Sequence, residues 1–168
     1  MSQGSARLSA MNSQVQILDQ ALLDEVTARA LTSARRRTNH NFHASAEDNP
    51  HRFLNALVKG TYCQPHRHHS PPKSESFLVL RGRVAVFVFD DAGKAIETHV
   101  LSTDGTLAVD IPSGIWHCIA AISDTAVCYE VKAGPWDPTT DKDFAPWAPA
   151  EGDPRAQVYL EMLLANVR

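Results

Sequence analysis

Hydrophobic and polar positions follow two different periods along this chain. From Gln14 to about Ser33 the apolar residues recur at spacings of three, four and five, which is typical of an amphipathic helix. The residues concerned are Ile17, Leu18, Ala21, Leu22, Val26, Ala30 and Leu31. We therefore expect an N-terminal helix that packs one side on an apolar surface.

The segments on either side of this helix carry no periodic pattern. Residues 1–13 are rich in Ser, Gln, Ala and Asn and predict a flexible lead-in. Residues 35–43 gather Arg, Thr, Asn and His, and such clusters favour turns because their side chains bond to nearby backbone groups. We expect irregular chain in both places.

From Arg52 to Lys132 the sequence becomes a succession of short β-like runs separated by Gly, Asp and Pro turn signals. The runs cover residues 52–58, 61–66, 75–80, 83–89, 96–101, 106–111, 116–122 and 126–131. About eight strands at regular spacing is the number of a jelly roll. The pattern predicts an all-β, single-domain jelly-roll barrel.

One run needs cover on both sides. Arg83 to Phe89 is apolar on both alternating faces, so its outer face must pack on the N-terminal helix, the C-terminal tail or a second subunit of a homodimer. The tail is rich in Pro and Trp and should wrap the barrel, and Asp153-Pro154 should begin a short closing helix. The expected division is 1–13 flexible, 14–51 helix and loop, 52–133 barrel, 134–168 wrap and helix.

Composition and charge exclude several classes of protein. With 16 Lys+Arg against 19 Asp+Glu in 168 residues, no basic field exists to bind a nucleic acid backbone. No apolar run has the length of a signal peptide or a membrane span, so we expect a cytoplasmic protein with no membrane partner. Three cysteines without a CxxC pair argue against a disulfide framework.

Three histidines and a carboxylate carry the chemistry. His66 and His68 project to one side of a strand, with Cα atoms roughly 6–7 Å apart, while His69 points away. Glu75 opens the next run, and His117 follows a Pro-x-Gly turn that could aim it into the barrel. Imidazole and carboxylate are ligands of divalent transition metals, so these four predict one metal site.

The spacing of these residues resembles the two motifs of the cupin superfamily. The residues similar to the first motif are Gly60, His66-x-His68, Glu75 and Gly82, separated by five, six and six residues. The residues similar to the second motif are Gly105, Pro112-x-Gly114 and His117, separated by six and two residues. Two features depart from these motifs. The gap before Glu75 is longer than is common, and Ala121 stands where Asn is frequent. The resemblance implies a cupin (RmlC-like) barrel.

A narrower resemblance covers about residues 17 to 163. Residues 39–43, 52–57, 65–68, 134–138 and 141–149 are similar to the WbuC-type cupin-fold metalloproteins. This resemblance implies a bacterial protein of a group often encoded with O-antigen and other polysaccharide biosynthesis genes. It implies no particular reaction.

The expected cofactor is one divalent transition metal ion, namely Zn, Fe, Mn or Ni, and the expected partner is a small molecule, one derived from a sugar being favoured. An ion with open positions could activate water or polarise a substrate oxygen. Weaker catalytic candidates are Tyr62, Gln64, Arg81, Glu130, His40 and His43. The favoured function is an isomerase, epimerase or lyase reaction. A non-catalytic sensor and an iron-dependent dioxygenase are alternatives, and a metal-free epimerase is disfavoured.

Overall fold

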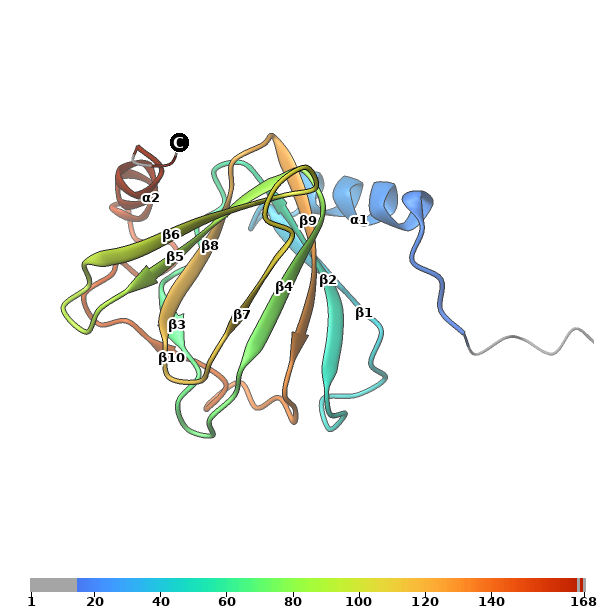
Figure 1. Ribbon diagram of the computed structural model, residues 1–168, viewed down its shortest axis with the longest axis horizontal. Coiled ribbons are helices and arrows are strands. Elements are labelled where there is room, and N and C mark those ends of the chain that lie inside the picture. The colour runs from blue at the N-terminus through green and yellow to red at the C-terminus, as the bar shows by residue number, and fades with distance from the viewer. Residues whose placement is uncertain (1–14, 166, 168) are drawn as a thin grey trace, which may run out of the picture.

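Two five-stranded antiparallel sheets face each other in the computed structural model, which describes residues 15–165 and 167 (Figure 1). The strand order is β1-β2-β9-β4-β7 in one sheet and β10-β3-β8-β5-β6 in the other. The elements are α1 (Gln20–Thr32), β1 (Arg37–Asn41), β2 (His51–Val58), β3 (His66–Arg67), β4 (Glu75–Arg81), β5 (Arg83–Phe89), β6 (Ala95–Ser102), β7 (Ala108–Ile111), β8 (Trp116–Ala121), β9 (Thr125–Lys132), β10 (Asp143–Phe144) and α2 (Ala156–Leu164). The expected cupin jelly roll, with a helix near each end of the described chain, is confirmed.

The space between the two sheets holds the main core. Side chains alternate along each strand, so one parity of every strand points inward. The inward residues of this core are Leu57, Phe77, Val79, Val84, Val86, Leu101, Ile111, Ile119, Ala121, Ala126 and Cys128, and all are buried. They fill one end of the barrel and leave the other end to polar residues.

Helix α1 covers the outer face of the first sheet. Leu23, Val26 and Ala30 pack on Leu54 and Val127, which point outward from β2 and β9. The helix begins later than expected, because Asp19 accepts a hydrogen bond from the backbone N–H of Leu22 and caps it. Its buried side also includes Leu23 rather than Ile17 or Leu31, which are exposed. The lead-in over residues 1–13, and Gln14, lie outside the described residues.

The outer face of the second sheet is covered by the C-terminal part of the same chain. Phe87 and Phe89 of β5 lie in a cluster with Ala145, Leu160 and Leu163. Figure 1 shows α2 beside β5 and β6, at the opposite end of the molecule from α1. The cover that the doubly apolar run requires is therefore supplied within one chain, and this run gives no reason to expect a dimer.

Two expected segments differ from the structure. Residues 37–41 form a regular strand, β1, which pairs along its whole length with β2, whereas irregular chain was expected there. The strand expected over 61–66 is reduced to His66–Arg67, which pairs with β8 at one position and with β10 at two. Both differences come from tertiary pairing overriding the local signal of the sequence.

Candidate metal centre

His66, His68, Glu75 and His117 converge inside the barrel from both sheets. His66 lies directly opposite His117 in the β3–β8 pair, and Glu75 is the first residue of β4 in the other sheet. All four side chains are buried, and one potential ligand atom from each lies within 4.8 Å of the others. Strand parity, pairing and the closure of the barrel thus bring together residues far apart in the sequence.

The three imidazoles are held in the same tautomer. The Nδ1 atom of His66 lies 3.0 Å from the backbone oxygen of Gln64, and that of His117 lies 2.8 Å from that of Ile115. The Nδ1 atom of His68 contacts the backbone oxygen of Asp141. Because a carbonyl oxygen only accepts, each Nδ1 must carry the proton. In each neutral ring, Nε2 is then an unprotonated ligand atom, an arrangement typical of metal-binding histidines.

The Nε2 atoms crowd the Glu75 carboxylate. His68 Nε2 lies 3.3 Å from Glu75 Oε1, and His117 Nε2 contacts the same oxygen. None of these three buried atoms has a hydrogen bond of good geometry to a described residue. Lone pairs facing one another in a buried site are costly without a proton or a cation between them. The cluster therefore fits a cupin metal site.

Electrostatics also favours ligands ready for a metal. Burial, followed by the charge of Lys142, holds the pKa of His66 well below its ordinary value, so this ring is neutral at pH 7. Burial alone would raise the pKa of Glu75, but hydrogen bonds from His117 and His68, when these rings carry a proton on Nε2, hold that pKa well below the usual range, and a bound metal ion would take the place of those protons. Neutral imidazole and ionised carboxylate are the forms that bind divalent ions.

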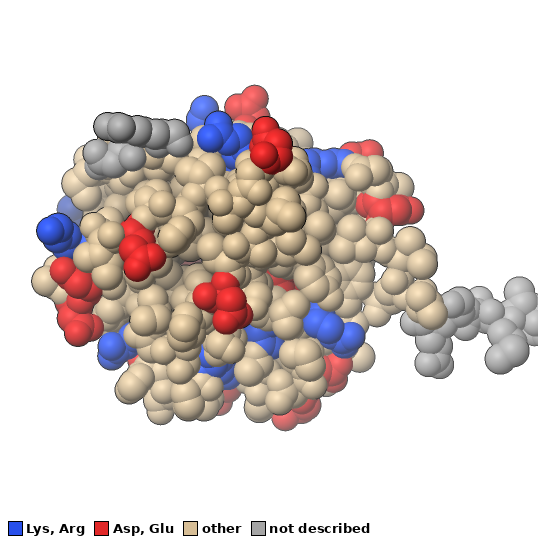
Figure 2. Space-filling view, viewed as in Figure 1, with Lys and Arg blue, Asp and Glu red and all other residues tan. Residues whose placement is uncertain are grey.

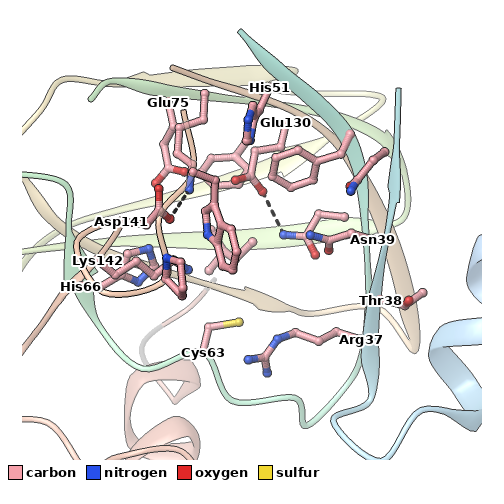
Figure 3. Close-up of a pocket in the computed structure, with 18 of the residues that line it drawn as sticks. Arg37, Thr38, Asn39, His51, Cys63, His66, Glu75, Glu130, Asp141 and Lys142 are labelled. Carbon is pink, nitrogen blue, oxygen red and sulfur yellow. Dashed lines mark hydrogen bonds and ion pairs between the residues drawn. The ribbon is translucent and has the colours of Figure 1, made fainter. Parts of the chain in front are cut away.

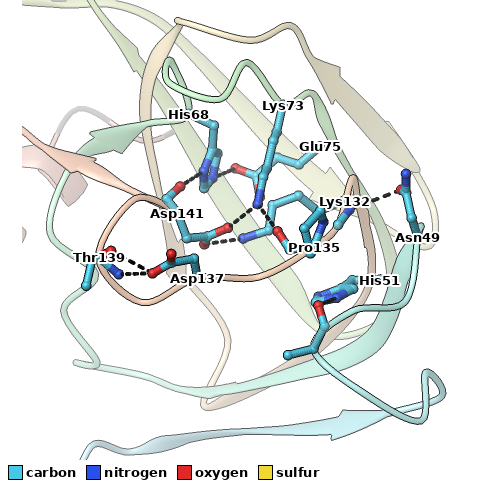
Figure 4. Close-up of polar contacts among 12 residues, drawn as sticks. Asn49, His51, His68, Lys73, Glu75, Lys132, Pro135, Asp137, Thr139 and Asp141 are labelled. Atoms are coloured by element: carbon cyan, nitrogen blue, oxygen red, sulfur yellow. Dashed lines mark hydrogen bonds and ion pairs between the residues drawn. The ribbon is translucent and has the colours of Figure 1, made fainter.

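A buried ionic triad supports His68 from behind (Figure 4). Lys73 Nζ lies 3.0 Å from Asp141 Oδ1, and Lys132 Nζ lies 2.6 Å from Asp141 Oδ2. All three residues are buried, and Lys73 also donates to the backbone oxygen of Pro135. The backbone oxygen that orients His68 belongs to Asp141. The triad therefore fixes the segment that positions His68.

A cavity of about 780 Å³ opens beside the cluster (Figure 3). It is lined by His66, Glu75 and His117, by polar residues of β1 and β2, and by residues 136–144 of the C-terminal part. Trp136 and Phe144 also line it and are about half exposed. The volume lies within the range of small-molecule sites.

Glu130 is another buried carboxyl group of this cavity, besides Glu75 and Asp141. Burial, together with the negative charge of Glu75, raises the pKa of Glu130 to about 8. Asn55 donates a hydrogen bond of 3.0 Å to Glu130 Oε2, while Asn55 Oδ1 is buried without a hydrogen bond to a described residue. A carboxyl group with a pKa near neutrality can give or take a proton beside a bound ligand.

The weaker candidates divide into two groups. Gln64, Glu130 and His43 line the cavity. Arg81 instead bonds to Asp24 and Gln20 on α1, and Tyr62 donates to the backbone of Pro149. The ring of His40 contacts that of Phe42. The described residues that line the cavity do not include His40, Tyr62 or Arg81.

Several residues of the site were not found from the sequence. They are His51, Asn55, Lys73, Lys132, Asp141 and Lys142. The ring of His51 stacks on that of His43, with the ring centroids 4.1 Å apart. Parity within β2 and β9 could have placed Asn55 and Lys132 inward. His69, which strand parity excluded as a ligand, is exposed.

This architecture and cluster define the chain as a jelly-roll protein of the cupin type with a buried site suited to a metal. A family model described as "Domain of unknown function (DUF6016)" matches residues 18–101, and the chain belongs to this family. The search of curated proteins gave no match. Among described residues, no helix is long and apolar enough to cross a membrane.

Solved structures support the fold. The capsular polysaccharide assembling protein CapF from Staphylococcus aureus is 26% identical, with a TM-score of 0.56, over 64% of this chain and 29% of CapF. CapF with the inhibitor 3-isopropenyl-tropolone gives 26% identity and a TM-score of 0.57, over 67% and 32%. The chain thus spans about a third of CapF. The protein TT1209 from Thermus thermophilus is 21% identical over 71% of this chain and 97% of TT1209, with a TM-score of 0.53.

Proposed function

We propose that His66, His68, Glu75 and His117 bind one divalent transition metal ion and that the protein acts on a small carbohydrate-related molecule. The observation that carries the metal proposal is the convergence of three imidazole rings, each bonded to a backbone oxygen through Nδ1, on a buried carboxylate oxygen that lacks a geometrically good hydrogen bond. When bound, such an ion supplies a Lewis acid that polarises a substrate oxygen or lowers the pKa of a bound water.

The lining of the cavity supports a polyhydroxylated ligand. Asn39, Asn41, Asn55 and Gln64 offer amide donors and acceptors, and the free acceptor Oδ1 of Asn55 suits a ligand hydroxyl group. The rings of Trp136 and Phe144 provide apolar faces for the C–H surface of a sugar ring. The similarity to part of the capsular polysaccharide assembling protein CapF agrees with this class of ligand.

Glu130 is the residue we assign to proton transfer. It lies in the cavity, is buried, and is held by Asn55. Burial raises its pKa toward neutrality, so it can donate a proton and take one back from a neighbouring ligand atom. Such reversible transfer suits an isomerase, epimerase or lyase step, and we place the chain with the WbuC-type proteins associated with polysaccharide biosynthesis.

The test combines metal analysis with turnover. Metal-loaded protein is incubated with a panel of sugars and nucleotide sugars, and loss of substrate or exchange of C–H hydrogen with ²H₂O is followed by NMR. We expect turnover that is abolished by a chelator and by His68→Ala, with the activity of His69→Ala unchanged. Metal retained undiminished in His68→Ala would overturn the site.

The outcomes also separate the competing functions. Metal-dependent binding of a sugar without turnover by any metal form would favour a sensor or binding module over an enzyme. Oxygen uptake by the iron form with an organic substrate would favour a dioxygenase. Full activity in chelator would contradict metal dependence and favour an acid–base mechanism without metal.

A further inference from the structure

The cavity gathers positive charge although the chain as a whole is negative. Its basic lining residues are Arg35, Arg37, Lys132 and Lys142, and Lys73 lies buried behind them. The formal net charge of the chain is −3 at pH 7. On the face seen in Figure 2, acidic and basic residues are interspersed without a large block of one sign. The concentration of cations is thus a local property of the cavity.

Of the four carboxyl groups that line the cavity, Glu130 is mostly protonated at pH 7 and Glu75 belongs to the candidate metal site, so two carboxylates remain beside these cations. Arg35 and Arg37 both bind one carboxylate, that of Glu151. Lys73 and Lys132 likewise share the carboxylate of Asp141. Each group has two positive charges for one negative charge, and the Lys73–Asp141 group is almost completely buried. Buried charge without compensation is costly, which favours a further anion in this cavity.

Lys142 is the cation best placed to meet that anion. Its ammonium group makes no ion pair or hydrogen bond within the described part of the chain, and it lines the cavity beside His66 (Figure 3). After burial, its charge is the largest cause that lowers the pKa of His66. Arg37 and Lys142 also exert the two largest charge effects on Cys63, which lines the cavity as well. Both cations therefore act on the same region.

We propose that the ligand of this cavity carries an anionic group, a carboxylate or a phosphate, which binds to Lys142 on the side that faces Arg37 and Cys63. The proposal rests on the proposed function, because it names the ligand class of the same site. Within carbohydrate chemistry it favours sugar acids and sugar phosphates over neutral sugars. An anion at this place also offsets the charge that a divalent ion adds beside Glu75.

The test measures binding to metal-loaded protein by calorimetry, with D-glucuronate, D-glucose 6-phosphate and D-glucose as probes. We expect at least one anionic probe to bind about tenfold or more tightly than glucose, which corresponds to one well-placed charge–charge contact. Lys142→Met should remove about that factor for the anion and leave glucose unaffected. The stronger of the two anions identifies carboxylate or phosphate as the group recognised.

Lys94→Met is the matched control, because it removes the same charge from an exposed lysine in the turn between β5 and β6. Equal affinity for all three probes, binding of none of them, or equal effects of the two lysine substitutions would overturn the proposal. Metal content is measured on the same samples. Protein that holds its metal but prefers no anion leaves the metal-centre proposal standing, so the two failures are distinguishable.

Discussion

The two ends of the barrel interior are built from the same strands and differ in nearly every inward residue. Along β9 the inward positions run from Ala126 and Cys128 to Glu130 and Lys132. Along β4, which runs antiparallel, they run from Val79 and Phe77 to Glu75. One end is therefore a dry apolar core, and the other holds buried charges and the cavity.

The apolar end stabilises the fold, whereas the polar end is suited to bind a ligand. Burial of apolar side chains favours folding, whereas burial of charged groups is at best neutral unless they are well paired. The polar end contains histidines, three carboxyl groups and two lysines, all buried. These buried polar groups are expected to bind a ligand, while the apolar end supplies the stability of the fold.

The largest effect on stability is expected at the apolar end. Leu57 is completely buried in the core, and Leu57→Ala leaves a cavity there. The free energy of unfolding should fall by about 2–5 kcal/mol in denaturant titrations. The metal dissociation constant of the folded variant should stay close to that of the parent protein. A large loss of metal affinity in folded Leu57→Ala would show that the two ends are not separable.

Glu130 should make the polar end sensitive to pH. Its pKa rises from 4.5 to about 8 on folding, so the folded state holds the proton more tightly than the unfolded state. Stability should therefore be highest below about pH 4.5 for this group and decrease as the pH rises to about 8, by on the order of 5 kcal/mol. Glu130→Gln should remove this slope in chelator-treated protein, as followed by denaturant unfolding at several pH values. Identical slopes in both proteins would contradict the assignment.

Metal removal should destabilise the polar end specifically. A ligand that binds only the folded state at about one hundred times its dissociation constant adds about 2.7 kcal/mol to the free energy of unfolding. Chelation should lower the melting temperature of the parent protein and leave that of His117→Ala unchanged. An equal decrease in both proteins would mean that the stabilising ion binds elsewhere.

The Asp141 triad should affect metal affinity more than overall folding. Asp141→Asn weakens the contacts to Lys73 and Lys132 that hold the segment whose backbone orients His68. We expect metal affinity to fall about 10–100-fold in competition with a chromophoric chelator. The matched variant Asp143→Asn, at a partly exposed aspartate in β10, should keep the parent affinity. If refolding alone restored the metal affinity of Asp141→Asn to that of the parent protein, the lower affinity would reflect a folding defect instead.

The sequence predicted the strands that contain a clear apolar run. Strands β2, β4, β5, β8 and β9 were found within one residue, although β5 and β8 are buried on both faces. Strand β1 was missed because its cavity-lining residues Arg37, Asn39 and Asn41 are polar and of types that favour turns. Strand β10 has two residues and forms only through pairing with β3.

The site shows the same division between local and long-range information. The four clustered residues were predicted because their residue types and parity carry the signal. The triad could not be predicted, since Lys73 and Asp141 are 68 positions apart and meet only after the tail has wrapped around the barrel. The raised pKa of Glu130 depends likewise on its depth and on Glu75 across the cavity.

Elemental analysis of the purified protein, of His117→Ala and of His69→Ala tests whether the four clustered residues bind a metal ion. His117 is buried in the cluster, whereas His69 is a neighbouring histidine that is exposed. We expect about one transition-metal ion per chain in the parent protein and in His69→Ala, and little metal in His117→Ala, because three ligands hold an ion more weakly than four. Equal metal content in all three proteins, or a parent protein that cannot be loaded with any divalent ion, would contradict this expectation.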